Sequence, residues 1–281
     1  MDDLKRDVEV VVISDVHLGT QGCRAKELLN YLKSINPEIL ILNGDIIDMW
    51  QFKKWYWPKT HLKVVKNIIG KAARGTKTYY ISGNHDELLR KFSPIKLGKL
   101  QVVDKLVLYL NGQRVLFFHG DVFDAVMKYS KFIAKLGAIS YDSLILINSI
   151  INRIIKLFGN RKVSLSKKIK DSVKSAVKYI NKFEETAAIH ALKKGYNQIV
   201  CGHIHKAEIR TINVNNESIC YMNSGDWVES LTALEFNNSK WTIYNYGESF
   251  IDTNDKEPED LAIIDNSNKT VFIKLLNEFK D

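Results

Sequence analysis

Five short motifs contain most of the side chains in this 281-residue sequence that could bind a metal ion. In chain order they are Asp15-x-His17, Gly44-Asp45, Gly83-Asn84-His85-Asp86, His119-Gly120-Asp121 and Gly202-His203-x-His205. Five of the seven histidines lie in these motifs, which leaves His61 and His190 as expected structural or surface residues. Carboxylate, imidazole and amide donors without sulfur suit manganese, iron, zinc or magnesium. Asp45 supplies a carboxylate that could bridge two such ions.

Each motif has a simpler interpretation when it is taken alone. An isolated Asp-x-His is common, and both Gly-Asp and Gly-Asn-His-Asp consist of good turn formers. Gly-His-x-His is more informative, because two histidines beside a glycine that follows an apolar strand have little packing rationale. Five such motifs together, each after a strand-like run, favour a metal site over coincidence.

Apolar, β-branched runs precede the motifs and predict the elements that position them. Helical spacing is found at 25–35, 61–73 and 184–194, and strands are expected at 8–14, 39–42, 78–81, 102–110, 114–118 and 198–201. Asn111-Gly112 predicts a hairpin turn between 102–110 and 114–118, and further strands are expected at 208–214, 218–222, 231–236 and 240–246. This order predicts an α/β (α+β) fold of two β-sheets flanked by helices, with the motifs at the sheet edge where ligands bind. Because Asp15 and His17 are two apart at a strand end, we expect their side chains to point the same way.

The five motifs together resemble the calcineurin-like metallophosphoesterase superfamily, whose pattern is DxH, GDxxD, GNH(D/E), HG and GHxH. The resemblance implies a four-layer αββα sandwich of two mixed sheets and a centre of two divalent metal ions, manganese first. It also implies two ligand sets that share Asp45 as the bridge. These sets are Asp15, His17, Asp45 and His205 for one metal, and Asp45, Asn84, His119 and His203 for the other.

The reaction class follows from such a centre. Two divalent cations can lower the pKa of a shared water and stabilise in-line displacement at phosphorus, so a phosphoric ester or diphosphate hydrolase is predicted. His85 is not needed for coordination. We hypothesise that it hydrogen-bonds the phosphoryl group or protonates the leaving oxygen, with Asp86 orienting it. Asp48 and Asp121 are interpreted as partners that orient the ligands.

The formal charge of +9 is concentrated in residues 125–182, which contain thirteen Lys and Arg against two Asp. The same stretch is rich in bulky aliphatic residues. It is either a pair of helices with a solvated basic face, or a helical lid with a groove for acyl chains and cations for phosphate or anionic lipid. The predicted organisation is a phosphoesterase core at 1–124 and 183–246, this insertion, and a tail at 247–281 to which no role is assigned.

Residues 8–246 also resemble the UDP-2,3-diacylglucosamine diphosphatase group, through the segments 44–50, 55–58 and 223–229 as well as the metal motifs. This implies cleavage of a nucleotide-linked glycolipid into UMP and a lipid-linked sugar 1-phosphate during lipid A synthesis. The best studied enzymes of that group carry Arg where this chain has His85. The tryptophan-rich stretch that follows Asp45 is interpreted either as packing or as substrate contacts. The candidates for contact with uracil, an acyl chain or the phosphates are Lys53, Lys54, Trp55 and Trp57.

Two other activities use the same metal motifs. One is a general phosphodiesterase or phosphatase that acts on nucleotides or other small phosphoesters. The other is a nuclease, since the basic segment could bind nucleic acid phosphates. The nuclease is disfavoured, because the basic residues alternate with aliphatic side chains and not with the aromatic side chains that stack on bases.

The expected location is the cytoplasm, with peripheral contact at the inner face of the membrane. The three cysteines are widely spaced and form no CxxC pair, which suggests neither a disulfide framework nor a thiolate zinc site. The N-terminus is charged and lacks the apolar region of a signal peptide, and no run reaches roughly 18 apolar residues.

Overall fold

Two mixed β-sheets form the centre of the computed structural model, which describes residues 5–50, 56–123 and 165–249 and, in its longest helix, the side chains from residue 177 onward. The larger sheet has the strand order β12-β11-β1-β2-β3-β5-β4. Its strands are β1 (Arg6–Ile13), β2 (Ile35–Asn43), β3 (Lys77–Ile81), β4 (Ile95–Leu97), β5 (Leu100–Val103), β11 (Thr232–Asn237) and β12 (Lys240–Asn245). Neighbouring strands are parallel from β1 through β2 and β3 to β5, and antiparallel at both edges.

The smaller sheet has the order β6-β7-β8-β10-β9. Its strands are β6 (Leu106–Leu110), β7 (Gln113–Phe117), β8 (Gln198–Cys201), β9 (Glu208–Val214) and β10 (Glu217–Asn223). The three central strands are parallel, with Val115 opposite Gln198 and Cys220 opposite the same residue on the other side. Parallel strands all end at one edge of a sheet, so the loops after β7 and β8 leave it side by side.

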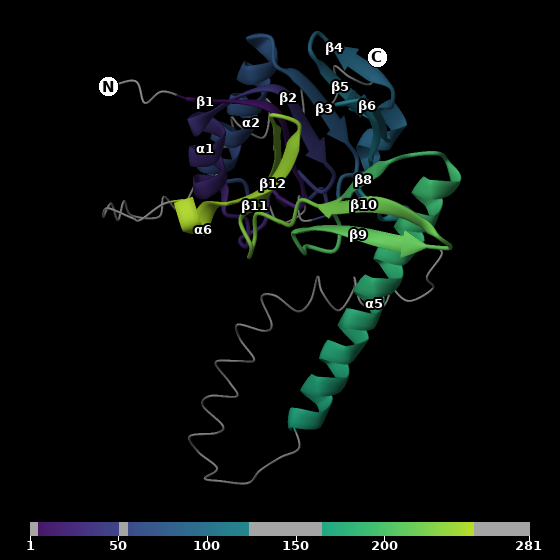
Figure 1. The fold of residues 1–281 in the computed structure, drawn as a ribbon. Helices are drawn as coiled ribbons and strands as arrows, with labels where there is room; N and C mark the ends of the chain where they lie inside the picture. Colours follow the sequence, from purple (N-terminus) through teal and green to yellow (C-terminus); the bar gives the residue numbers. More distant parts are fainter. Residues whose placement is uncertain (1–4, 51–55, 124–164, 250–281) are drawn as a thin grey trace, which may run out of the picture.

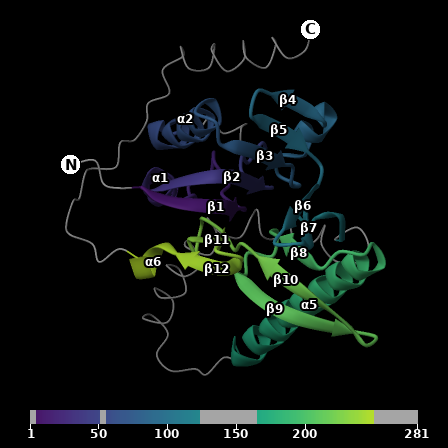
Figure 2. The same ribbon diagram turned by 45° about the horizontal axis from the view of Figure 1, so that its top comes forward.

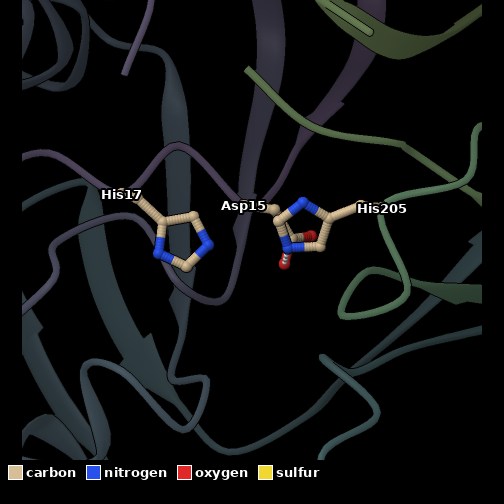
Figure 3. Close-up of side chains that lie close together, drawn as sticks. All are labelled: Asp15, His17 and His205. Carbon is tan, nitrogen blue, oxygen red and sulfur yellow. Dashed lines mark ion pairs between the residues drawn. The ribbon is translucent and has the colours of Figure 1, made fainter. Parts of the chain in front are cut away.

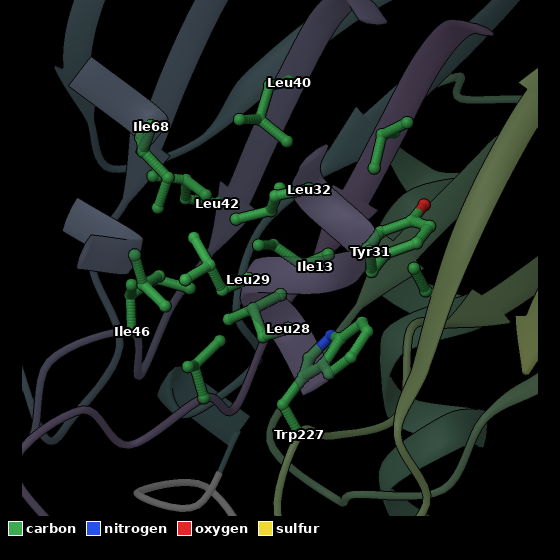
Figure 4. Close-up of a cluster of buried hydrophobic side chains, with 14 of the residues drawn as sticks. Ile13, Leu28, Leu29, Tyr31, Leu32, Leu40, Leu42, Ile46, Ile68 and Trp227 are labelled. Carbon is green, nitrogen blue, oxygen red and sulfur yellow. The ribbon is translucent and has the colours of Figure 1, made fainter. Parts of the chain in front are cut away.

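Helices cover the outer faces of both sheets (Figures 1 and 2). Helices α1 (Ala25–Ser34) and α2 (Lys59–Ala73) pack on the larger sheet, and α5 (Leu165–Lys193) packs on the smaller one. The alternation along β1 shows how the sequence produces these layers. Val10 and Val12 face the smaller sheet, while Val11 and Ile13 face the helices, as Figure 4 shows for Ile13 with Leu28 of α1. The predicted four-layer αββα sandwich is confirmed.

One predicted strand is divided in the structure. The run 102–110 is apolar enough to be one strand, but β5 ends at Val103 in the larger sheet and β6 begins at Leu106 in the smaller one. The polar pair between them, Asp104 and Lys105, lies where the chain crosses from one sheet to the other. The hairpin after β6 is confirmed, with positive φ at Asn111 and Gly112 as a tight two-residue turn requires.

Two short elements were missed, because each is too short to show a clear periodic pattern in the sequence. These are β4, the edge strand that pairs with β5, and the 3₁₀ helix η2 (Glu87–Phe92) directly after the Gly-Asn-His-Asp motif.

The predicted insertion falls largely outside the described residues. The described part resumes at 165 with α5, a single helix that crosses the predicted boundary between 182 and 183. Most of the predicted tail, 250–281, also lies outside, while Tyr246–Ser249 forms the short helix α6. The insertion and the tail therefore remain sequence predictions. Among the helices that the structure describes, none combines the length and apolar character that spanning a membrane requires.

Candidate metal centre

All five motifs follow the carboxyl ends of parallel strands. Asp15 follows β1, Asp45 follows β2, Asn84 follows β3, His119 follows β7 and His203 follows β8. The two sheets are stacked so that these ends meet, and backbone bonds join the loops directly. The Asp15 N–H donates to the carbonyl of Gly44 at 3.1 Å, and the Gly202 N–H donates to the carbonyl of His119 at 3.0 Å.

The backbone at this edge is left-handed at five of the candidate ligands. φ lies between 52° and 72° at Asp15, His17, Asp45, His203 and His205. This conformation is uncommon for residues other than glycine, and it gathers at functional sites where the surroundings impose it. Asp15 and His17 lie in one cluster as expected, but not through strand alternation, because β1 ends at Ile13 and neither residue is extended.

The first cluster consists of Asp15, His17 and His205 (Figure 3), which each place a ligand atom within 4.8 Å of the others. His205 Nε2 lies 3.3 Å from Asp15 Oδ1. The other oxygen of the same carboxylate, Oδ2, accepts a hydrogen bond from the His203 N–H at 3.0 Å. One carboxylate oxygen thus fixes the loop after β8, and the other is directed into the cluster.

The second cluster consists of Asp45, His119 and His203. His119 is buried, and its Nδ1–H donates to the carbonyl of Asn43 at 2.9 Å, which leaves Nε2 facing Asp45 Oδ2 at 3.2 Å. A backbone acceptor on the far nitrogen fixes the tautomer and orientation of a metal-binding histidine in the same way. The second oxygen of Asp45, Oδ1, accepts the His85 N–H at 2.8 Å.

Two motif glycines leave room for these side chains. A Cβ on Gly44 would lie 2.3 Å from Nδ1 of His119, and a Cβ on Gly83 would lie 2.1 Å from Oδ1 of Asp45. Both distances are far below a van der Waals contact, so any larger residue at these positions must displace a candidate ligand.

Burial and charge pairing act against each other on these groups. Burial would raise the pKa of Asp15, but the neighbouring His205 cation lowers it to about 2. Burial would lower the pKa of His205, but Asp15 raises it to about 9. In the second cluster, burial is again outweighed, so the pKa of Asp45 lies far below its usual range and that of His119 well above it. A metal ion that binds these histidines must displace protons.

His85 and Asp48 form a third group together with His17. Asp48 Oδ2 lies 3.0 Å from Nδ1 of His85 and 3.5 Å from Nδ1 of His17. Burial would lower the pKa of His85, but the hydrogen bond to Asp48 raises it above its usual value. Asp48 is thus placed to orient both rings, as the sequence predicted for a supporting carboxylate. Asp121, the other predicted supporting carboxylate, pairs with Arg90 at 2.5 Å.

The role expected of Asp86 is corrected. Its carboxylate is buried and accepts four hydrogen bonds, from the Ile46 N–H at 2.9 Å, the Ile47 N–H at 3.5 Å, the Gly83 N–H at 2.6 Å and the Tyr80 hydroxyl at 2.5 Å. These bonds join the loops after β2 and β3, whereas the His85 ring is oriented by Asp48. Neighbours in sequence are therefore not partners here, because consecutive side chains in this loop point in different directions.

The tryptophans after Asp45 occupy different environments. Trp57 packs beside Gly19 and lies edge-on to His61, with ring centroids 5.7 Å apart, which agrees with the packing interpretation. Lys53, Lys54 and Trp55 lie outside the described residues. Trp50 begins the tryptophan-rich stretch but was not named as a contact: it is 46% exposed, and its ring centroid lies 4.3 Å from that of His85. Its place in the segment 44–50 was the available signal.

The donors present fit a pair of divalent cations. Asp15 Oδ1 and His119 Nε2 face only their charged partners His205 and Asp45, and Asn84 Oδ1 is buried without a hydrogen-bond partner among the described residues. A buried polar atom without a partner is costly unless a ligand satisfies it. The clusters offer carboxylate and imidazole donors, Asn84 adds an amide oxygen, and together with the match to a phosphoesterase family they indicate a dinuclear divalent metal site.

The family match and the sequence relatives agree with this chemistry. Residues 8–207 match the family described as Calcineurin-like phosphoesterase. A UDP-2,3-diacylglucosamine hydrolase of Aliivibrio fischeri is 26% identical over 245 residues, which cover 84% of this chain and 97% of that protein. The protein of the same name from Escherichia coli K12 is 28% identical and covers 76% and 89%. A solved archaeal phosphodiesterase aligns over 84% of this chain and 98% of its own, at 12% identity and a TM-score of 0.39.

Proposed function

The chain belongs to the calcineurin-like phosphoesterase family and is a metal-dependent hydrolase of phosphoesters or diphosphates, and from this premise we propose that its substrate is UDP-2,3-diacylglucosamine. The products are UMP and a lipid-linked sugar 1-phosphate. The main support for this substrate is that relatives named for this activity match the chain over almost their whole length. The proposed setting is the cytoplasm, at the inner face of the membrane where a lipid-linked substrate resides.

Seven residues are proposed as the ligands of two manganese ions, with iron, zinc or magnesium as the alternatives. One ion is held by Asp15, His17, Asp45 and His205, and the other by Asp45, Asn84, His119 and His203. Support comes from the first and second clusters, from the unpartnered Oδ1 of Asn84, and from the position of Asp45 with one oxygen 3.2 Å from His119. Such a pair of cations supplies charge that stabilises phosphorus-centred displacement.

The residues of the chain perform three tasks in this proposal. The backbone N–H groups of His203 and His85 hold the carboxylates of Asp15 and Asp45 in place. The Asn43 carbonyl keeps the proton of His119 on Nδ1, so that Nε2 is available as a ligand. Asp86 holds the loops after β2 and β3 at a fixed separation.

His85 is proposed as the residue that donates a proton to the substrate. Asp48 accepts from Nδ1, which leaves Nε2–H to contact the phosphoryl group or the leaving oxygen. The hydrogen bond to Asp48 raises the pKa of His85 above its usual value, which favours the proton-donating form of the ring. A second candidate function, hydrolysis of nucleotides or other small phosphoesters, is favoured by His85 itself, since the best studied lipid A enzymes carry Arg there.

The test is a comparison of substrates. Manganese-loaded protein is incubated separately with UDP-2,3-diacylglucosamine in detergent, a cyclic nucleotide and single-stranded DNA, and the products are identified by mass spectrometry. Release of UMP from the first substrate alone is expected. Turnover of the cyclic nucleotide without any release of UMP would support the second candidate and exclude the lipid substrate.

A further inference from the structure

The solvent-facing side of α2 carries cations and aliphatic side chains together. Four exposed cations lie along it at helical spacing: Lys59, Lys63, Lys66 and Arg74. Leu62 and Ile69, two turns apart on the same side, are 38% and 54% exposed. The opposite side of the helix, with Val64 and Ile68, packs into the core of the larger sheet. This exposed side is called the α2 face below.

No carboxylate compensates the charge of the α2 face. The sequence contains neither Asp nor Glu between Asp48 and Asp86, a span that includes the whole helix. Within the described part of the chain, none of the four cations forms an ion pair. The neighbouring helix α1 adds Lys26 and Lys33 against Glu27. The α2 face is therefore locally rich in positive charge, although most of the net positive charge of the sequence lies in residues 125–182.

The α2 face begins beside the metal centre. His61, in the first turn of α2, accepts the Gly19 N–H on Nδ1 at 2.9 Å, and Gly19 is two residues beyond the candidate ligand His17. From there the helix runs back along the outer surface of the larger sheet. Helix α5 lies on the outer surface of the other sheet (Figure 2), so a flat surface that contacts α2 would not also contact α5.

We propose that the α2 face docks the protein onto an anionic lipid bilayer. Lysines that lie at a bilayer surface are attracted by anionic headgroups, and exposed aliphatic side chains between them enter the interface. A nucleic acid would account for the cations but not for Leu62 and Ile69, since nucleic acid partners are recognised by polar and aromatic contacts. The inference deepens the proposed function, because a lipid-linked substrate is met at a membrane, and docking here brings the edge with the metal centre close to it.

Vesicle sedimentation of the full-length protein tests this docking. Lys59→Gln/Lys63→Gln/Lys66→Gln is expected to lower partitioning to phosphatidylcholine vesicles with 30% phosphatidylglycerol by roughly 100-fold, since each of the three cations near the surface contributes a factor of about five. Leu62→Ser/Ile69→Ser is expected to weaken binding at high salt, where the electrostatic attraction is screened. The matched control is Lys193→Gln/Lys194→Gln, two exposed lysines at the end of α5, which should bind as the wild type does.

Failure of this inference is distinguishable from failure of the proposed function. Vesicle binding is measured without turnover, and hydrolysis of soluble bis(4-nitrophenyl) phosphate should be the same in all variants, which shows that they are folded. Equal vesicle binding by the triple variant and the wild type would overturn the proposal. So would loss of single-stranded DNA binding in the triple variant with vesicle binding unchanged, which would make the α2 face a nucleic acid surface.

Discussion

Replacement of Asp48 by Asn tests how the chain controls the proton on His85. Asp48 Oδ2 lies 3.0 Å from His85 Nδ1, and its side chain is only 5% exposed, so solvent screens the pair little. A hydrogen bond to a charged group contributes about 1.5–3 kcal/mol, which corresponds to about 1–2 pH units. Asn removes the charge but keeps a similar shape. The pKa of His85, raised by Asp48 in the native protein, is therefore expected to fall.

The sign of the effect on activity follows from the proposed role. If His85 acts as a proton donor, the rate declines as pH rises through its pKa. This decline is the alkaline limb of the pH–rate profile. In Asp48→Asn the limb should move to lower pH by about 1–2 units, and kcat near neutral pH should fall about 10- to 100-fold. The metal ions are the same in both proteins, so their own influence on His85 cancels in the comparison.

The assay is a pH–rate profile with bis(4-nitrophenyl) phosphate, alongside metal content by atomic emission. Asp121→Asn is the matched control, because that carboxylate pairs with Arg90 and should leave the limb where it is. His85→Asn should remove the limb and keep both metals. Loss of metal in Asp48→Asn with an unmoved limb would refute the reasoning, and would mean that Asp48 acts through His17, 3.5 Å away.

Three further outcomes follow from the structure. Burial lowers the pKa of His61 to about 4, and its neutral Nδ1 accepts the Gly19 N–H. Its contribution of about 3 kcal/mol to the free energy of unfolding is therefore present above pH 6.5 and is lost as pH falls towards 4. Urea unfolding at pH 7 and 4.5 should show this loss, and His61→Gln should reduce the difference between the two pH values. In Gly83→Ala the new Cβ would lie 2.1 Å from an oxygen of Asp45, so this variant should lose about 1–3 kcal/mol of unfolding free energy and bind less metal. Gly70→Ala in α2 is the control and should be neutral or stabilising. Equal stability and metal content in the two variants would contradict the close approach of Gly83 to Asp45. Chelation of the metals should abolish hydrolysis and lower Tm, with activity restored by manganese, and a chelated protein that retained full activity would exclude metal dependence.

The layered fold could be predicted because local patterns determined it. Buried strands such as β1 and β2 are continuous apolar runs that stop at polar loops, and the helices between them have clear apolar faces. The Asn-Gly turn after β6 predicted the hairpin of β6 and β7. The crossing between β5 and β6 could not be predicted from 102–110, because β5 joins the larger sheet through a strand distant in the sequence, with Thr78 opposite Leu100.

The residue types of the site could be predicted from the sequence, but the contacts between their side chains could not. Residue types and their order after strands selected Asp15, His17 and His205, and the structure places their ligand atoms within 4.8 Å of one another. The expected pairing of Asp86 with His85 failed, because the Asp86 carboxylate is held by the Ile46 and Gly83 N–H groups and the Tyr80 hydroxyl. Asp48, 37 positions from His85, is the partner instead, through a contact that only the tertiary structure creates. The left-handed φ at Asp15 likewise has no sequence signature, since it is imposed by neighbouring loops.

The central claim, that Asp45 joins two metal ions in one hydrolytic centre, is tested most directly by counting metal ions per chain. Native mass spectrometry of the manganese-loaded protein should give two ions for the wild type. His205→Ala should lose the ion of the first cluster and keep the other, and Asp45→Ala should lose both. A wild-type protein that saturates with one ion, or an Asp45→Ala variant that keeps two, would contradict the account.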